Sequence, residues 1–72
     1  MSKKIEVVAI ATDEDKELVR LLADGNSGSK IAELLKSNEN TVAFNLSVIR
    51  KKFNCRNSIS LVAYFLRNKI IE

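Results

Sequence analysis

The 72-residue chain contains no proline and no histidine, one cysteine and two glycines. Proline and glycine punctuate turn-rich β folds, so their scarcity leaves long stretches free to be helical. The one cysteine, Cys55, excludes an internal disulfide, and without histidine a zinc site lacks a usual ligand. No apolar run is long enough to cross a bilayer, and residues 5–11 are too short an apolar run for a signal peptide. The sequence therefore predicts a helical, cytoplasmic protein without metal, cofactor, small-molecule substrate or membrane.

Hydrophobic residues make up 46% of the chain and charged residues 29%, which is typical of a globular domain rather than of a disordered segment. Acidic side chains outnumber basic ones over residues 1–24, whereas Arg50, Lys51, Lys52 and Arg56 form a basic segment without any acidic residue between them. Such a cluster can neutralise phosphates. Basic residues are also favoured at a helix C-terminus by the helix dipole alone. The two interpretations are compatible.

Capping residues and apolar spacing divide the chain into elements. A β-branched run over residues 1–11 predicts an extended N-terminal arm, which covers the core or, less favoured, pairs with a second chain. Residues 12–72 read as one domain, in which good N-cap side chains precede apolar runs with helical spacing. The predicted N-caps are Thr12, Ser27, Asn38 and Asn57. The predicted helices cover about 13–24, 28–36, 39–53 and 58–69.

The second and third predicted helices are separated by only a few residues, which is typical of a helix-turn-helix motif. In the third helix, apolar side chains recur at a spacing that predicts one face turned to the core. These side chains are Val42, Leu46, Ile49 and Phe53.

The last predicted helix carries two apolar stripes instead of one. The first stripe consists of Ile59, Val62, Ala63, Leu66 and Ile70, and the second consists of Leu61 and Phe65 with Tyr64 beside them. A terminal helix in so small a domain cannot easily bury both stripes against its own core, so we expect one stripe to meet another chain. We place the dimer interface at Leu61, Tyr64 and Phe65. The alternative assigns these three side chains to the core.

Spaced segments of the sequence resemble the LuxR/GerE DNA-binding domain, from Thr12 to about Ile71. The opening helix with its terminating glycine, the motif helices and the link to the last helix all have counterparts there. The segments that carry the resemblance are Thr12 with Asp15, Glu17 and Leu18-Val19-Arg20-Leu21-Leu22-Ala23-Asp24-Gly25; Ser27, Ile31-Ala32 and Leu35; Thr41-Val42, Phe44, Leu46, Ile49 and Lys51-Lys52-Phe53; and Cys55-Arg56-Asn57.

The resemblance implies an all-α domain, similar to a four-helix bundle, with a helix-turn-helix whose third helix enters the DNA major groove. It also implies dimerisation through the fourth helix, and a chain this short is similar to the family's stand-alone regulators. This sequence departs from the family at Ala43, Asn45 and Ser47, where the family commonly offers a basic residue, a histidine and a basic or amide residue. The groove-facing surface is therefore nearly uncharged.

Candidate DNA contacts fall into three groups. Polar side chains of the third helix can hydrogen-bond to bases or phosphates, although a plain solvated helix face has the same composition. Ala43 and Phe44 can touch a thymine methyl group, whereas Phe44 can instead cover the core together with Val48. Basic residues, and the start of the second helix, can meet phosphates. The full set is Ser29, Lys30, Asn40, Thr41, Ala43, Phe44, Asn45, Ser47, Arg50, Lys51 and Lys52.

These observations lead to one main hypothesis, a homodimeric regulator of transcription that binds specific sequences of double-stranded DNA. An interaction protein of the same fold, which pairs with another regulator of the family and binds DNA weakly, is the alternative. A sigma-factor region is a third possibility, but the double stripe of the last helix fits the LuxR/GerE family better. An enzyme is not expected, because the chain lacks histidine, clustered carboxylates at catalytic spacing and a phosphate-cradling loop.

Overall fold

A computed structural model describes residues 10–72, which fold into helices without any strand. The helices are α1 (Asp13–Ala23), α2 (Gly28–Leu34), α3 (Glu39–Lys52) and α4 (Ser58–Arg67). The predicted all-α fold and its helix order are therefore confirmed. Residues 1–9 of the predicted N-terminal arm lie outside the described residues. Within the described part of the chain, no helix has the length and apolar character of a membrane span.

All four helices begin at the N-caps that the sequence predicts. Each cap side chain accepts a hydrogen bond from the backbone N–H three residues further on, at 2.8–3.1 Å. Thr12 and Asn57 also form capping boxes, since the side chains of Asp15 and Ser60 accept in return from the backbone N–H of the cap. These bonds satisfy donors that would otherwise have no partner within the helix.

The same hydrogen-bond motif ends every described helix. The second residue after the C-cap donates its backbone N–H to the carbonyl five positions earlier, at 2.7–3.3 Å, and the residue between has a positive φ. This arrangement is a Schellman motif. Glycine holds the positive-φ position once, at Gly25, and the others are Lys36, Asn54 and Lys69. Consequently α2 and α4 end two residues before these lysines, at Leu34 and Arg67, and not at about Lys36 and Lys69 as predicted.

The core gathers one face of each helix. The predicted stripe of α3 is confirmed, because Val42, Leu46, Ile49 and Phe53 are all buried. They pack with Leu18 and Val19 of α1, Ile31 and Ala32 of α2, and Leu61 and Phe65 of α4. The Phe53 and Phe65 rings meet edge to face with centroids 5.0 Å apart, a favourable geometry for an aromatic pair.

The burial of α4 corrects part of the predicted dimer interface. Leu61 and Phe65 are 0% exposed, so their side chains have no surface left to offer a second chain. The stripe that contains them packs on the core. In the other stripe Ile59 and Leu66 are exposed, whereas Val62 and Ile70 are partly buried against the core. Beyond α4, the turn at Lys69 brings Ile71 back onto the core, where it is buried.

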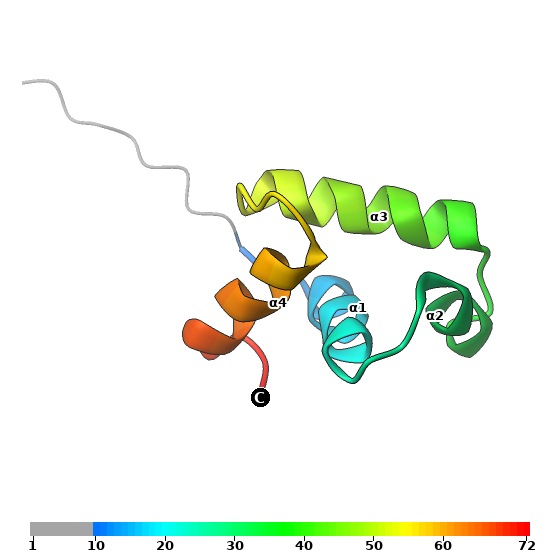
Figure 1. The fold of residues 1–72 in the computed structure, drawn as a ribbon, viewed down its shortest axis with the longest axis horizontal. Helices are drawn as coiled ribbons and strands as arrows, with labels where there is room; N and C mark the ends of the chain where they lie inside the picture. The colour runs from blue at the N-terminus through cyan, green and yellow to red at the C-terminus, as the bar shows by residue number, and fades with distance from the viewer. Residues whose placement is uncertain (1–9) are drawn as a thin grey trace, which may run out of the picture.

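Figure 1 shows α3 as the longest helix, with the other three lying along one side of it. Helix α1 contacts each of the other three helices, while α2 packs against α3. The link between α2 and α3 comprises only residues 35–38, which is the short turn that the sequence predicts for a helix-turn-helix pair. The side of α3 that is turned away from α1, α2 and α4 is therefore not covered by any of them.

Candidate nucleic-acid interface

The outer face of α3 is an uncovered helical surface that carries candidate contacts. Asn40, Phe44, Ser47 and Lys51 follow one another at intervals of four, three and four residues, so they share one face of the helix. The buried stripe of α3 has the same spacing and starts two residues later, which places it on the opposite side. We call these four residues the outer stripe.

Three of the four residues of the outer stripe are exposed. Asn40, Phe44 and Lys51 are exposed, and Ser47 is half-buried. Phe44 retains 67% of its accessible surface, which rules out the alternative that it covers the core. Its neighbour one turn further on, Val48, is also exposed. The outer stripe is therefore partly apolar, although it faces solvent.

Charge along α3 changes abruptly. Residues 40–49 carry no charged side chain, and Arg50, Lys51 and Lys52 follow at once. Lys51 is exposed and Arg50 is half-buried. A ligand that lies along the outer stripe would meet neutral side chains from Asn40 to Ser47 and positive charge at Lys51, near the C-terminal end of α3.

Three predicted contacts lie on the flanks of α3. Thr41 donates its backbone N–H to the Asn38 side chain at 2.9 Å, and its own side chain is exposed. Ala43 is exposed as well. Asn45 lines a groove between α3 and α1, together with Glu14, Glu17 and Leu35, and so is separated from the outer stripe.

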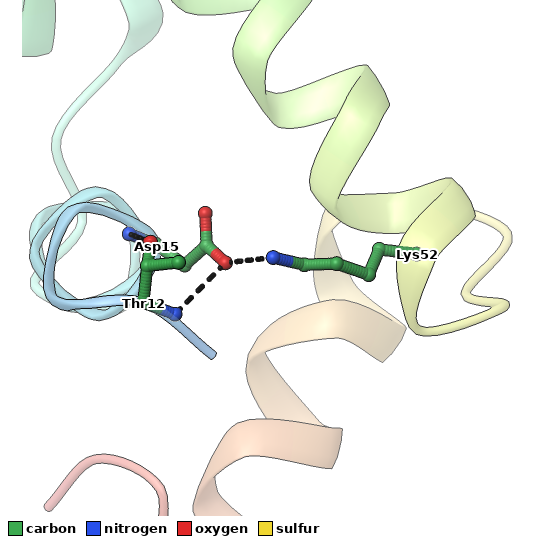
Figure 2. Close-up of polar contacts among 3 residues, drawn as sticks. All are labelled: Thr12, Asp15 and Lys52. Atoms are coloured by element: carbon green, nitrogen blue, oxygen red, sulfur yellow. Dashed lines mark hydrogen bonds and ion pairs between the residues drawn. The ribbon is translucent and has the colours of Figure 1, made fainter. Parts of the chain in front are cut away.

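Lys52 has a partner within the protein. Its ammonium group forms an ion pair with Asp15, which also accepts from the Thr12 backbone N–H at 3.1 Å (Figure 2). The same ammonium lies 5.6 Å from the centroid of the Phe53 ring. The pair links the capping box of α1 to the last turn of α3. Within the basic segment of residues 50–52, the side chain of Lys52 thus links α3 to α1.

The pKa of Asp15 responds to this environment. Burial alone would raise it, since the charged form loses hydration. The hydrogen bond and the charge of Lys52, together with the hydrogen bonds from Thr12, outweigh burial and hold the pKa below its ordinary value of 3.8. Asp15 therefore stays ionised and keeps Lys52 in place at neutral pH.

The start of α2 offers weaker candidates. Lys30 pairs with Glu33 at 3.0 Å, and both side chains are more than half exposed. Such a surface pair contributes between nothing and about 1 kcal/mol, so Lys30 is free to exchange Glu33 for another anion. Ser29 is exposed beside it.

Helix α4 presents a second uncovered surface. Ile59 retains 82% of its accessible surface, and Tyr64 and Leu66 are exposed too. Ile59, Ala63 and Tyr64 line an open groove against the α3–α4 link. The sequence had placed Ile59 and Leu66 on an apolar stripe but had not chosen them for the interface. Both stripes of α4 are equally apolar, so composition held no signal for the choice.

Metal-binding groups do not cluster in residues 10–72, which contain no set of three or more cysteine, aspartate or glutamate side chains placed to share an ion. The thiol of Cys55 is half-buried and donates to the Phe53 carbonyl at 3.6 Å.

Comparison with models of protein families finds a match over most of the chain. The model of a family described as bacterial regulatory proteins, luxR family, matches residues 10–65, which include all of α1, α2 and α3 and most of α4. The resemblance seen in the sequence is thereby confirmed. No curated protein matches the chain.

Proposed function

Since the chain belongs to the luxR family of bacterial regulatory proteins, we propose that it regulates transcription by binding specific DNA sequences as a homodimer. The family comprises DNA-binding proteins of the helix-turn-helix class, which regulate transcription. The proposal also includes the residues that contact DNA, the formation of a homodimer and a location in the cytoplasm.

The proposal rests above all on the outer stripe of α3 and the basic residues that follow it. In helix-turn-helix proteins, the second helix of the motif lies in the major groove and its N-terminal part meets base edges. Asn40 and Phe44 occupy that part of α3, and Ser47 follows just past the middle of the helix. Arg50 and Lys51, at the other end, are placed to neutralise phosphates, which fix the position of a protein on the duplex.

The remaining candidates take subordinate roles in the proposal. Thr41, Ala43 and Asn45 lie on the flanks of α3 and would meet the walls of the groove. Ser29 and Lys30 would contact a phosphate once Lys30 leaves Glu33. Lys52 acts indirectly, because its pair with Asp15 holds the C-terminal end of α3 against α1.

Salt dependence of binding provides the test. Affinity for a selected duplex, measured by fluorescence anisotropy, should fall steeply with salt because bound phosphates release counterions. The Lys51→Glu variant should weaken binding to all duplexes alike and should reduce the salt slope by about two in a dimer, one unit per protomer. The matched control is Arg20→Glu, which makes the same charge change on the exposed side of α1 and should leave the slope unchanged. Equal slopes for the two variants would refute the proposed orientation.

We propose that the exposed apolar side chains of α4 form the dimer contact. Ile59, Tyr64 and Leu66 are uncovered in the single chain, and burying such apolar surface favours association. Analytical ultracentrifugation should give twice the monomer mass of 8.1 kDa. The Ile59→Ser variant should sediment as a monomer. Leu34→Ser makes a matching apolar-to-polar change at an exposed leucine of α2 and should remain dimeric. A wild-type monomer at high concentration would contradict this part of the proposal.

One observation favours a second candidate function. The uncharged run over residues 40–49 gives α3 little attraction for phosphates along most of its length. In the alternative, α4 pairs with a related regulator, and the mixed dimer binds DNA poorly. Retention of discrete promoter fragments by the chain alone would support the main proposal. Formation of a mixed dimer with a luxR-family protein, without any retention of DNA by the chain alone, would support the alternative.

A further inference from the structure

The most exposed large apolar side chain of α3 lies in the middle of its outer stripe. Phe44 is 67% exposed, and Val48, four residues further on, is 46% exposed beside the groove that Asn45 lines. Covering the exposed ring with an apolar group of a partner would favour association. We infer that Phe44 reads thymine: the chain selects A·T pairs by contact with the thymine methyl group in the major groove. This inference rests on the proposed binding of α3 to DNA.

The chemistry of the major groove limits what Phe44 can recognise there. Guanine, adenine and cytosine present hydrogen-bonding groups along the groove, while thymine adds a methyl group at C5. An apolar ring has no donor or acceptor for the former and gains by covering the latter. A·T pairs are thus the pairs for which an exposed phenylalanine supplies a favourable contact.

The charge of α3 argues in the same direction. The commonest contact that selects guanine is an arginine or lysine that donates to guanine O6 and N7. Residues 40–49 contain neither, and the first basic side chains come at the C-terminal end of the helix. Asn40, one turn before Phe44 on the outer stripe, has the amide that pairs with adenine. Before Lys51, the outer stripe can therefore read both bases of A·T pairs and has no basic side chain with which to read G·C.

The test removes single methyl groups from the DNA. A preferred duplex is first selected from a random pool with the wild-type chain. Each thymine base is then replaced in turn by uracil, which lacks the methyl group and leaves base pairing unchanged. At one or two positions in each half-site, loss of the methyl group should weaken binding roughly fourfold, the effect expected for one buried methyl group. The Phe44→Ala variant should bind the thymine and uracil duplexes equally. Leu34→Ala, which shortens an exposed leucine of α2, should keep the wild-type preference.

The outcomes separate this inference from the proposal beneath it. Salt-sensitive, sequence-specific binding without any difference between thymine and uracil would overturn the inference and leave the proposed function standing. A uracil effect that persists unchanged in Phe44→Ala would overturn the role of Phe44. Failure of the wild-type chain to retain any duplex at low salt would overturn both the inference and the proposed function.

Discussion

The ion pair between Asp15 and Lys52 gives the sharpest test of how this small domain is held together. Replacing Asp15 by asparagine keeps the size of the side chain and an oxygen that can accept from the Thr12 backbone N–H. The change removes the negative charge that faces Lys52. Asp15→Asn therefore separates the tertiary ion pair from the local capping box.

The exposure of the two side chains sets the expected magnitude. The Asp15 side chain is 13% exposed and that of Lys52 is 31% exposed, so the pair is neither fully buried nor free in solvent. Exposed pairs contribute about 0.2–1 kcal/mol, and breaking a buried pair costs about 3–5 kcal/mol. We expect Asp15→Asn to lower the free energy of unfolding by about 1–2 kcal/mol at pH 7, between these limits. In a domain of this size each kcal/mol lowers Tm by about 4–8 °C.

The dependence on pH follows from the lowered pKa of Asp15. A carboxyl group whose pKa is lower in the folded than in the unfolded state contributes stability that is fully present above the unfolded pKa. That contribution is lost as the pH falls through the folded pKa. The difference between wild type and Asp15→Asn should thus be constant above about pH 5 and shrink below about pH 4, near the unfolded pKa of aspartate.

Urea denaturation followed by circular dichroism at pH 7 and at pH 3 would measure both effects. Lys52→Met, which keeps an apolar stem near Phe53, and the double variant complete a double-mutant cycle. The coupling free energy should account for most of the loss in Asp15→Asn at pH 7 and should be smaller at pH 3, which lies below the unfolded pKa of aspartate. A loss of the same size at both pH values would refute the role assigned to the charge of Asp15.

Three further predictions concern the elements of the fold. Lys36→Gly should raise the free energy of unfolding by roughly 0.5–1 kcal/mol in urea titrations, because a left-handed lysine is strained, and Gly25→Ala should lower it by a similar amount. An unchanged midpoint for both would contradict this account of the helix ends. Phe65→Ala should remove about 3–5 kcal/mol through the cavity it leaves, enough to unfold much of the protein at 37 °C, as calorimetry would show. Asn57→Ala should lower Tm by removing about 1 kcal/mol of capping, whereas Asn57→Ser should nearly restore it.

Local signals in the sequence predicted where the helices begin. A capping side chain acts on a backbone N–H only three residues away, so its effect is visible in a short window. The spacing that predicted the core face of α3 is local in the same sense, and all its members are buried. The ends of the helices were less predictable, because Lys36 and Lys69 hold a conformation that is usually left to glycine.

Features that depend on tertiary contact were not predictable. The two stripes of α4 are similar in composition, and which one is buried depends on how α4 packs against α1 and α3. Asp15 and Lys52 are 37 positions apart, so no helical spacing connects them. Likewise, Ile71 reaches the core only because the chain turns back after α4. For the candidate interface, the contacts of the α3 residues with DNA stay a prediction, and the structure adds that Phe44 is exposed while Asn45 lines a groove against α1.

The Schellman motifs also govern how this protein can change. Between α1 and α2, and again between α2 and α3, the residues that complete the end of one helix are followed directly by the N-cap of the next. Every residue of both links belongs either to the end of one helix or to the N-cap of the next. Removing one residue there would take away either a hydrogen bond of the Schellman motif or the N-cap of the next helix, and adding one would separate the two. Substitutions on the exposed side of α3 leave these links untouched. Under the proposed function, point mutations on α3 could therefore change the preferred DNA sequence without disturbing the fold, whereas insertions and deletions in these links would disrupt it.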